Sequence, residues 1–222
     1  MIGGCSAGTA DPPPAADRSA PATSATPAPP SATDATATVG PGRGTGFFAG
    51  SMPEVPLTFT MPAGWEVFEG WAVSKSGADP VFGLVFMDVA NIYADGCRWE
   101  LVDPPPAGKS VDDLVAAYAR APELEATPAR EVTLGGFAGQ YIQTTVPEYE
   151  EGECTEGRFG IFQLAGSSGG PNLWAQAPGQ KNQHWILDVD GNRLVVLAGD
   201  SGNMSAQDRT DLEGILGSLR IG

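Results

Sequence analysis

The amino-acid composition changes abruptly about a quarter of the way along the chain, and this change constrains the fold more than any other feature. Residues 1–56 contain ten of the twenty prolines, and their only aromatic side chains are Phe47 and Phe48. Such a segment cannot bury enough apolar surface to offset the entropy lost when its backbone is ordered. We therefore expect residues 6–53 to be a disordered Pro/Ala/Ser/Thr tether, and residues 54–222 to be a single folded domain.

The first residues suggest how such a tether would be attached. Ile2, Gly3, Gly4 and Cys5 match a bacterial lipobox, in which a signal peptidase cuts before a cysteine that receives lipid such as palmitate. The charged and apolar regions of a signal peptide do not precede this match, so we expect either a start upstream of Met1 or a sequence that begins near the mature end. The alternative is a stray cysteine in a flexible leader. We expect residues 1–5 to be a lipobox remnant whose lipidated Cys5 anchors the protein at the outer face of the cytoplasmic membrane.

The other two cysteines, Cys97 and Cys154, form an even pair in a protein that we expect to be exported, where disulfides persist. A disulfide between them would close a long loop and stabilise the domain by about 4 kcal/mol through chain entropy. The alternative is two separate buried thiols. A catalytic thiol is disfavoured, because the single histidine is distant in sequence and no nucleophile signature surrounds either cysteine.

Charge narrows the choice of partners. The chain has 12 Lys+Arg against 27 Asp+Glu, a formal net charge of −15. A surface this negative repels phosphate backbones, so nucleic acid is not an expected partner. The sequence contains no run of eighteen apolar residues, so no transmembrane helix is expected either. The expected partners are the membrane, through the N-terminal lipid, and an envelope protein or glycolipid.

Residue patterns after position 54 predict antiparallel strands with two helices. Alternating or continuous apolar residues predict the strands 55–60, 65–68, 81–86 with a continuation over 88–93, 131–134, 137–146, 158–164, 185–189 and 194–198. Gly135-Gly136 and Asp190-Gly191 predict hairpin turns. Capping boxes at Ser110 and Ser205 predict helices over 110–120 and 205–219. The expected class is α+β, an antiparallel sheet with helices packed on it.

The order of these elements supports a resemblance. The turn from Pro62 to Trp65, the helix near 110–120, the hairpin from Leu134 to Gly139 and the chain end Ser218-Leu219-Arg220-Ile221 occur in that order. Over residues 54–222 the chain resembles small PsbP-like envelope lipoproteins of high-GC Gram-positive (actinobacterial) bacteria. The resemblance implies a PsbP-like fold and an accessory or binding role, and it specifies no activity.

Two motifs resemble enzyme or metal sites. Residues 166–170 match the Gly-x-Ser-x-Gly elbow of serine hydrolases, with Ser168 as nucleophile and His184 as the only possible base, but more loop follows where a helix is required. The start of a calcium loop is suggested by Asp188 and Asp190, yet the glycine falls at the fourth position instead of the sixth, and Gly199 stands where the final glutamate is required. We expect a flexible loop at the first motif and a β-turn at the second.

Two other groups of side chains could form a binding surface. The acidic loop 147–157 contains Glu148, Glu150, Glu151, Glu153 and Glu156, and could hold a divalent cation or a basic partner, although solvated loop is the expected reading. The tryptophans are Trp65, Trp71, Trp99, Trp174 and Trp185. Most should pack in the core or in turns, and Trp174 is expected to be the most exposed.

No catalytic, cofactor-binding or metal-binding residue is assigned from these patterns. One histidine excludes multi-histidine metal sites, and two spare cysteines cannot form a structural zinc site alone. We expect a non-enzymatic binding or assembly module of the cell envelope, without a cofactor. The alternatives are an envelope hydrolase using Ser168 or a carboxylate pair, and an extracytoplasmic sensory domain.

Overall fold

The computed structural model describes residues 34–40, 54–164 and 170–222. Of these residues 44% lie in strands, every strand pair is antiparallel, and two α-helices accompany the sheets. The expected α+β class is confirmed in this coarse form, although the chain is mainly β. Cys5 and most of the expected tether lie outside the described residues.

The largest sheet has eight strands in the order β3-β4-β5-β14-β13-β10-β8, with β9 also paired to β10. Its strands are β3 (Trp65–Phe68), β4 (Ala72–Lys75), β5 (Gly83–Met87), β8 (Glu125–Ala126), β9 (Arg130–Leu134), β10 (Phe137–Thr145), β13 (Lys181–Val189) and β14 (Asn192–Asp200). The two predicted hairpins are its β9–β10 and β13–β14 pairs. Asp190 and Gly191 both have positive φ, as a tight two-residue hairpin turn requires.

Two smaller sheets complete the strands. One has the order β1-β2-β15 and the other the order β12-β11-β6-β7. Their strands are β1 (Ala35–Val39), β2 (Leu57–Met61), β15 (Arg220–Ile221), β6 (Val89–Asp95), β7 (Glu100–Leu101), β11 (Gly160–Leu164) and β12 (Leu173–Trp174). Short 3-10 turns lie at Glu151–Glu153 and Thr155–Gly157 in the acidic loop.

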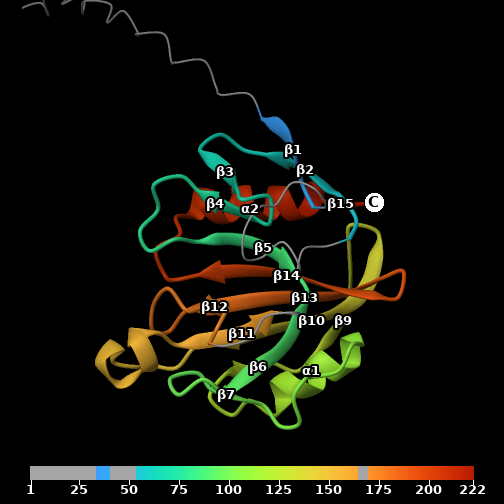
Figure 1. Cartoon of the computed structure of the whole chain (residues 1–222). Helices are drawn as coiled ribbons and strands as arrows, with labels where there is room; N and C mark the ends of the chain where they lie inside the picture. Colours follow the sequence, from blue (N-terminus) through green and yellow to red (C-terminus); the bar gives the residue numbers. More distant parts are fainter. Residues whose placement is uncertain (1–33, 41–53, 165–169) are drawn as a thin grey trace, which may run out of the picture. The chain divides into compact units, whose positions relative to one another are not determined.

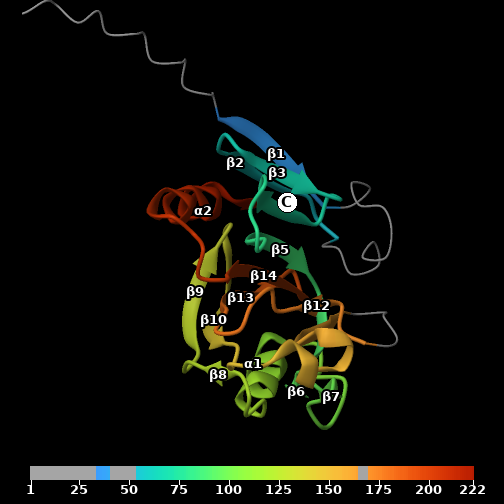
Figure 2. The ribbon, with the colours of Figure 1, turned by 90° about the vertical axis from the view of Figure 1, so that its left-hand side faces the viewer.

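Each face of the large sheet is covered by its own hydrophobic cluster. Along β14 the side chains alternate, with Val195 and Leu197 in one cluster and Leu194, Val196 and Ala198 in the other. The first cluster includes α1 (Val111–Ala119) and the β6–β11 pair, whereas the second includes α2 (Ala206–Ser218) and the β1–β2 pair. Both ribbon views accordingly place α2 with β1 and β2 on one side of β5, β14 and β13, and place α1 with β6 on the other (Figures 1 and 2).

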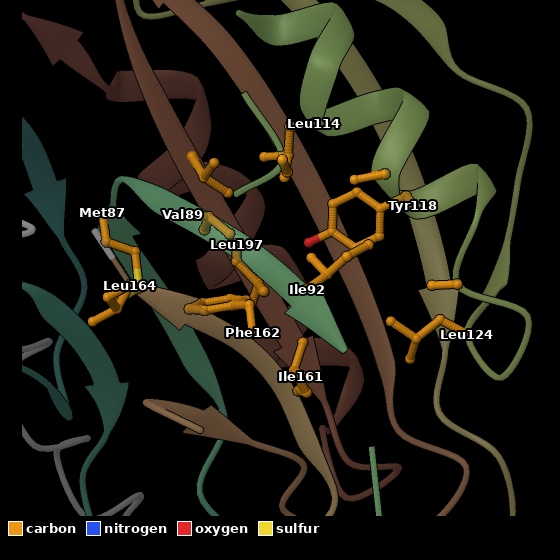
Figure 3. Close-up of a cluster of buried hydrophobic side chains, with 14 of the residues drawn as sticks. Met87, Val89, Ile92, Leu114, Tyr118, Leu124, Ile161, Phe162, Leu164 and Leu197 are labelled. Carbon is orange, nitrogen blue, oxygen red and sulfur yellow. The ribbon is translucent and has the colours of Figure 1, made fainter. Parts of the chain in front are cut away.

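Helix α1 buries its apolar stripe in the first cluster. Leu114 and Tyr118, four residues apart, point from the helix toward β6 and β11, where Ile92 and Phe162 are fully buried (Figure 3). The predicted capping boxes begin both helices: the Ser110 hydroxyl accepts a bond from the Asp113 backbone N–H, and Ser205 and Asp208 make the equivalent pair. The helix bounds therefore follow the sequence prediction closely, because caps are local signals.

Helix α2 is held to the edge of the large sheet by polar contacts as well as apolar ones. The indole N–H of Trp65 on β3 donates to Asp211 at 3.0 Å. Lys75 on β4 lies 3.0 Å from Asp208 and 3.6 Å from Asp211. Hydrogen bonds from Ser205 and then from Lys75 lower the pKa of the Asp208 carboxyl.

One part of the expected tether is ordered, so the boundary of the folded domain at residue 54 is wrong. Residues 35–39 form β1, which pairs along its whole length with β2. Val39 is fully buried and Ala37 nearly so, although the flanking composition is that of a spacer. The alternating Ala-Thr-Ala-Thr-Val of this segment places its apolar residues on one face, where Ala37 and Val39 join the buried cluster that includes residues of β2 and α2.

The predicted disulfide between Cys97 and Cys154 is present, and it spans 57 residues of sequence. It joins the segment after β6 to the acidic loop, and the backbone N–H of Thr155 also donates to the Cys97 carbonyl at 2.8 Å. The loop that precedes β11 is therefore tied to the neighbouring β6 by both a covalent bond and a hydrogen bond. No helix among the described residues is long and apolar enough to cross a membrane.

Candidate functional site

His184, the only possible base for the hydrolase alternative, is enclosed in the core. It lies in β13 with no exposed surface, and its ring nitrogens are 3.1 Å from the Tyr118 hydroxyl and 3.0 Å from the Thr144 hydroxyl. A neutral imidazole has one donor and one acceptor, and both hydroxyl partners can take either role. Burial lowers the pKa of His184 to about 3, so the ring is neutral at physiological pH. The position of His184 thus suits core packing and gives no access to a substrate.

The sequence also suggested a serine-hydrolase elbow, a calcium loop and a cation-binding acidic loop. Residues 165–169, including Ser168, lie outside the described residues. Asp188 accepts a 2.7 Å bond from the backbone N–H of Gly191, so the β-turn explanation of this motif is confirmed. Within the described ranges no three His, Cys, Asp or Glu side chains come together as a metal site, and this includes the described part of the acidic loop.

The feature of the described surface that best suits binding is a groove of about 530 Å³. It lies between the large sheet, at β4, β5 and β14, and the short strand β12 of the four-stranded sheet. Phe68, Trp71, Leu173 and Trp174 contribute apolar or aromatic walls. The volume is within the range of sites that bind small molecules, and apolar walls are typical of such sites.

Strand register explains why the groove is hollow. Ala72, Val85 and Leu197 stand side by side across β4, β5 and β14 and form an apolar row. The next row consists of Ser74, Gly83 and Gly199, which have small side chains or none. At Gly83 a Cβ atom would come within 2.0 Å of the Val73 carbonyl oxygen, so close approach of the two strands requires glycine there. Because this second row has little or no side-chain volume, space is left beside the apolar row, and that space forms the groove.

The groove also coincides with the exposed apolar surface. Among the described residues the exposed large hydrophobic side chains are Phe68 and Val81, each 51% exposed, and both line the groove. The Phe68 ring meets the Trp71 ring edge-on, with centroids 5.8 Å apart. Isolated exposed apolar residues are ordinary on protein surfaces, but a concentration at a cavity indicates a binding site.

Trp174, expected to be the most exposed tryptophan, is half-buried and forms part of the groove wall. The Arg158 guanidinium lies 4.4 Å from the centre of its ring. The carbonyl of Arg158 accepts a 3.1 Å bond from the Trp99 indole, and Arg158 lies only four residues after Cys154. The disulfide-linked loop therefore supports this wall. Trp65 and Trp71 are buried, and Trp99 and Trp185 are half-buried.

The polar end of the groove contains a pair of amide side chains. Gln180 lines the groove while almost fully buried, and its Nε2 donates to Oδ1 of Asn182 at 2.7 Å. Its Oε1 accepts from the Gln176 backbone N–H at 2.6 Å. Asn182 is completely buried, and its Nδ2 has no hydrogen-bond partner within the described part of the chain. An unpaired buried donor is costly in a folded protein, which makes this amide a feature to explain.

A second, more open depression of about 900 Å³ lies beside the N-terminus of α1. Its principal cation, Arg193, has only 4% of its side chain exposed and bonds to Asp88 and to the carbonyls of Val89, Gly108 and Ser110. Burial raises the pKa of Asp88 although Arg193 opposes the shift. Because Arg193 is already occupied in connecting β6, the following loop and α1, we assign it a structural role.

No protein-family model matches the chain, and no curated protein matches it.

The groove was not anticipated from the sequence. Gly83 and Gly199 gave a weak local signal, since glycines inside strand patterns often mark a close approach, but their alignment across strands depends on the register.

Proposed function

We propose that this chain is an exported binding module of the cell envelope, without catalytic activity, that takes a small, uncharged, largely apolar ligand into the groove. The observation that carries the proposal is that the exposed large hydrophobic side chains of the described surface line a cavity of suitable size. The enclosed position of His184 gives no support to the hydrolase alternative. We also propose that the chain is related to PsbP-like envelope lipoproteins, because its motifs and predicted elements occur in the same order along the sequence.

An uncharged ligand is favoured by the ionisable residues at the groove. Lys75 lines it, but its ammonium is paired with Asp208 and Asp211 on α2. Since that cation is engaged in holding the helix, it is not available to recognise an anionic ligand. Glu66 is the other ionisable residue of the lining, and its carboxylate repels an anionic ligand. The remaining polar lining is neutral amide and hydroxyl, including Gln180 and Ser74.

The groove is tested with N-phenyl-1-naphthylamine, an uncharged dye whose fluorescence rises and shifts to the blue in an apolar site. Purified protein should bind it saturably. Ser74→Phe fills the row of small residues and should weaken binding at least tenfold, while Thr60→Phe on the exposed side of β2 is the matched control and should leave binding unchanged. Absence of saturable binding by the wild-type protein, or equal weakening by both variants, would contradict the proposal.

The anchoring part of the proposal has its own experiment. The lipobox match at Cys5 and the composition of the tether support attachment to the membrane. Cys5→Ser, expressed behind an upstream start that supplies the signal region, should move the protein from the membrane fraction to the soluble fraction, and the matched control Ala7→Ser should stay in the membrane fraction. Membrane partitioning that is the same for Cys5→Ser and wild type would refute the anchor and leave the groove proposal standing.

A further inference from the structure

The groove has a polar site built into its floor, and this site bears on the chemistry of the ligand. The row formed by Ser74, Gly83 and Gly199 continues onto β13, where Gly199 pairs with Asn182. Gly199 and Gln180 line the groove, and Asn182 lies directly beside them. The small row therefore leads from the open groove to the buried amide pair.

Gly199 is what leaves the amides uncovered on the groove side. Its backbone conformation is open to any residue, so no turn or strain requires glycine at this position. A Cβ atom there would meet Nε2 of Gln180 at 3.2 Å and Oδ1 of Asn182 at 3.4 Å. A methyl group at position 199 would thus lie against the amide pair, where a ligand atom could otherwise approach.

The hydrogen bonds already made determine what that atom must be. Nε2 of Gln180 uses one of its two N–H bonds on Asn182, and both Oε1 of Gln180 and Oδ1 of Asn182 already accept hydrogen bonds. Asn182 presents Oδ1 toward position 199, and its Nδ2, unpaired within the described chain, is not among the atoms nearest to that position, so the donor that faces the groove is Nε2 of Gln180. The second N–H bond of Gln180 Nε2 is therefore left for an acceptor oxygen on a ligand.

We infer that the groove binds an apolar ligand bearing a neutral hydrogen-bond acceptor, an oxygen of the carbonyl type, which is received over Gly199 by the amide N–H of Gln180. The inference rests on the proposed binding function and adds the recognition element of the ligand. An acceptor placed there forms a hydrogen bond with the second N–H bond of Gln180 Nε2. A hydrocarbon of the same length fills the groove and leaves the donor unpaired.

Two probes of nearly equal length, methyl octanoate and decane, separate these cases by competition against N-phenyl-1-naphthylamine. The ester should displace the dye at a concentration about five- to tenfold lower than the hydrocarbon, the effect of one added hydrogen bond. Gly199→Ala should reduce this ratio to about one while leaving decane unaffected. Gly152→Ala, in the open space of the acidic loop, is the matched control and should keep the wild-type ratio.

The outcomes distinguish this inference from the proposed function. If ester and hydrocarbon displace the dye equally well from wild-type protein, the acceptor inference is wrong and the binding function stands. If the dye does not bind saturably, both are wrong. If the preference for ester survives in folded Gly199→Ala, recognition occurs elsewhere in the groove and the assignment to Gln180 fails. Should Gly199→Ala not fold, Gln180→Met removes the lining donor from a side chain of similar size, and the ratio measured on it decides in the same way.

Discussion

Acidification from pH 8 to pH 5 should destabilise the domain through His184. The folded protein holds this ring neutral with a pKa of about 3, whereas the unfolded chain has an ordinary histidine pKa near 6.5. Between these values the unfolded state binds a proton that the folded state does not, so stability falls as the pH falls. At pH 5 the linkage relation gives a loss of about 2 kcal/mol relative to pH 8.

The assay is urea unfolding followed by tryptophan fluorescence at both pH values. For an m-value of about 2 kcal/mol/M, the wild-type midpoint should fall by about 1 M urea from this residue alone. His184→Gln keeps hydrogen-bonding groups near Tyr118 and Thr144 but cannot titrate in this range. The variant will be less stable than wild type at pH 8, and its further loss at pH 5 should be about 2 kcal/mol smaller.

The comparison of variants isolates the histidine, because the carboxylates titrate alike in both proteins. Equal losses of stability between pH 8 and pH 5 in wild type and His184→Gln would refute the reasoning. That result would mean that the folded state accommodates a protonated imidazole between the Tyr118 and Thr144 hydroxyls, in conflict with the full burial of the ring.

Three further predictions concern stability and use urea unfolding at pH 8. Cys97→Ser should cost about 4 kcal/mol by opening a 57-residue loop, and a loss below 1 kcal/mol would show that the disulfide contributes little. Gly139→Ala should destabilise by several kcal/mol, because a Cβ would lie 2.1 Å from the Ile186 carbonyl oxygen. Gly214→Ala, on the open face of α2, should instead stabilise by about 0.5–1 kcal/mol. A change of the same sign in both variants would contradict this reasoning. Arg193→Met should cost about 3 kcal/mol, since several carbonyls lose a buried donor, and an unchanged midpoint would overturn its structural role.

The comparison of sequence with structure is clearest at β1. The composition around residues 35–39 predicts a spacer. Because composition is averaged over many residues, it does not reveal a strand of only five residues. Five residues with three apolar side chains on one face, two of them buried, are enough to add a strand when β2 offers an edge and the cluster that includes α2 surrounds them. Nothing local to the segment indicates that cover, so only the tertiary structure could reveal it.

The sequence by itself determined the features that depend on near neighbours in the chain. The two capping boxes, the Asp190-Gly191 turn and the Gly135-Gly136 hairpin follow from side-chain and backbone preferences over a few residues. The pairing of Cys97 with Cys154 followed from counting cysteines in a chain expected to be exported. Strands shorter than about four residues, such as β8 and β12, have too few residues to form a pattern and were not predicted.

Only the tertiary structure decided where a ligand could bind. Ser74, Gly83 and Gly199 are far apart in sequence, and they become one row because the registers of β4, β5 and β14 align them. The register of β13 against β14 places Asn182 beside the groove. His184 contacts Tyr118 instead, although Asn182 and His184 are neighbours on one face of β13. Register is set by the packing of the whole sheet against its two clusters, so no local pattern could show that Asn182 lies beside the groove and His184 beside Tyr118.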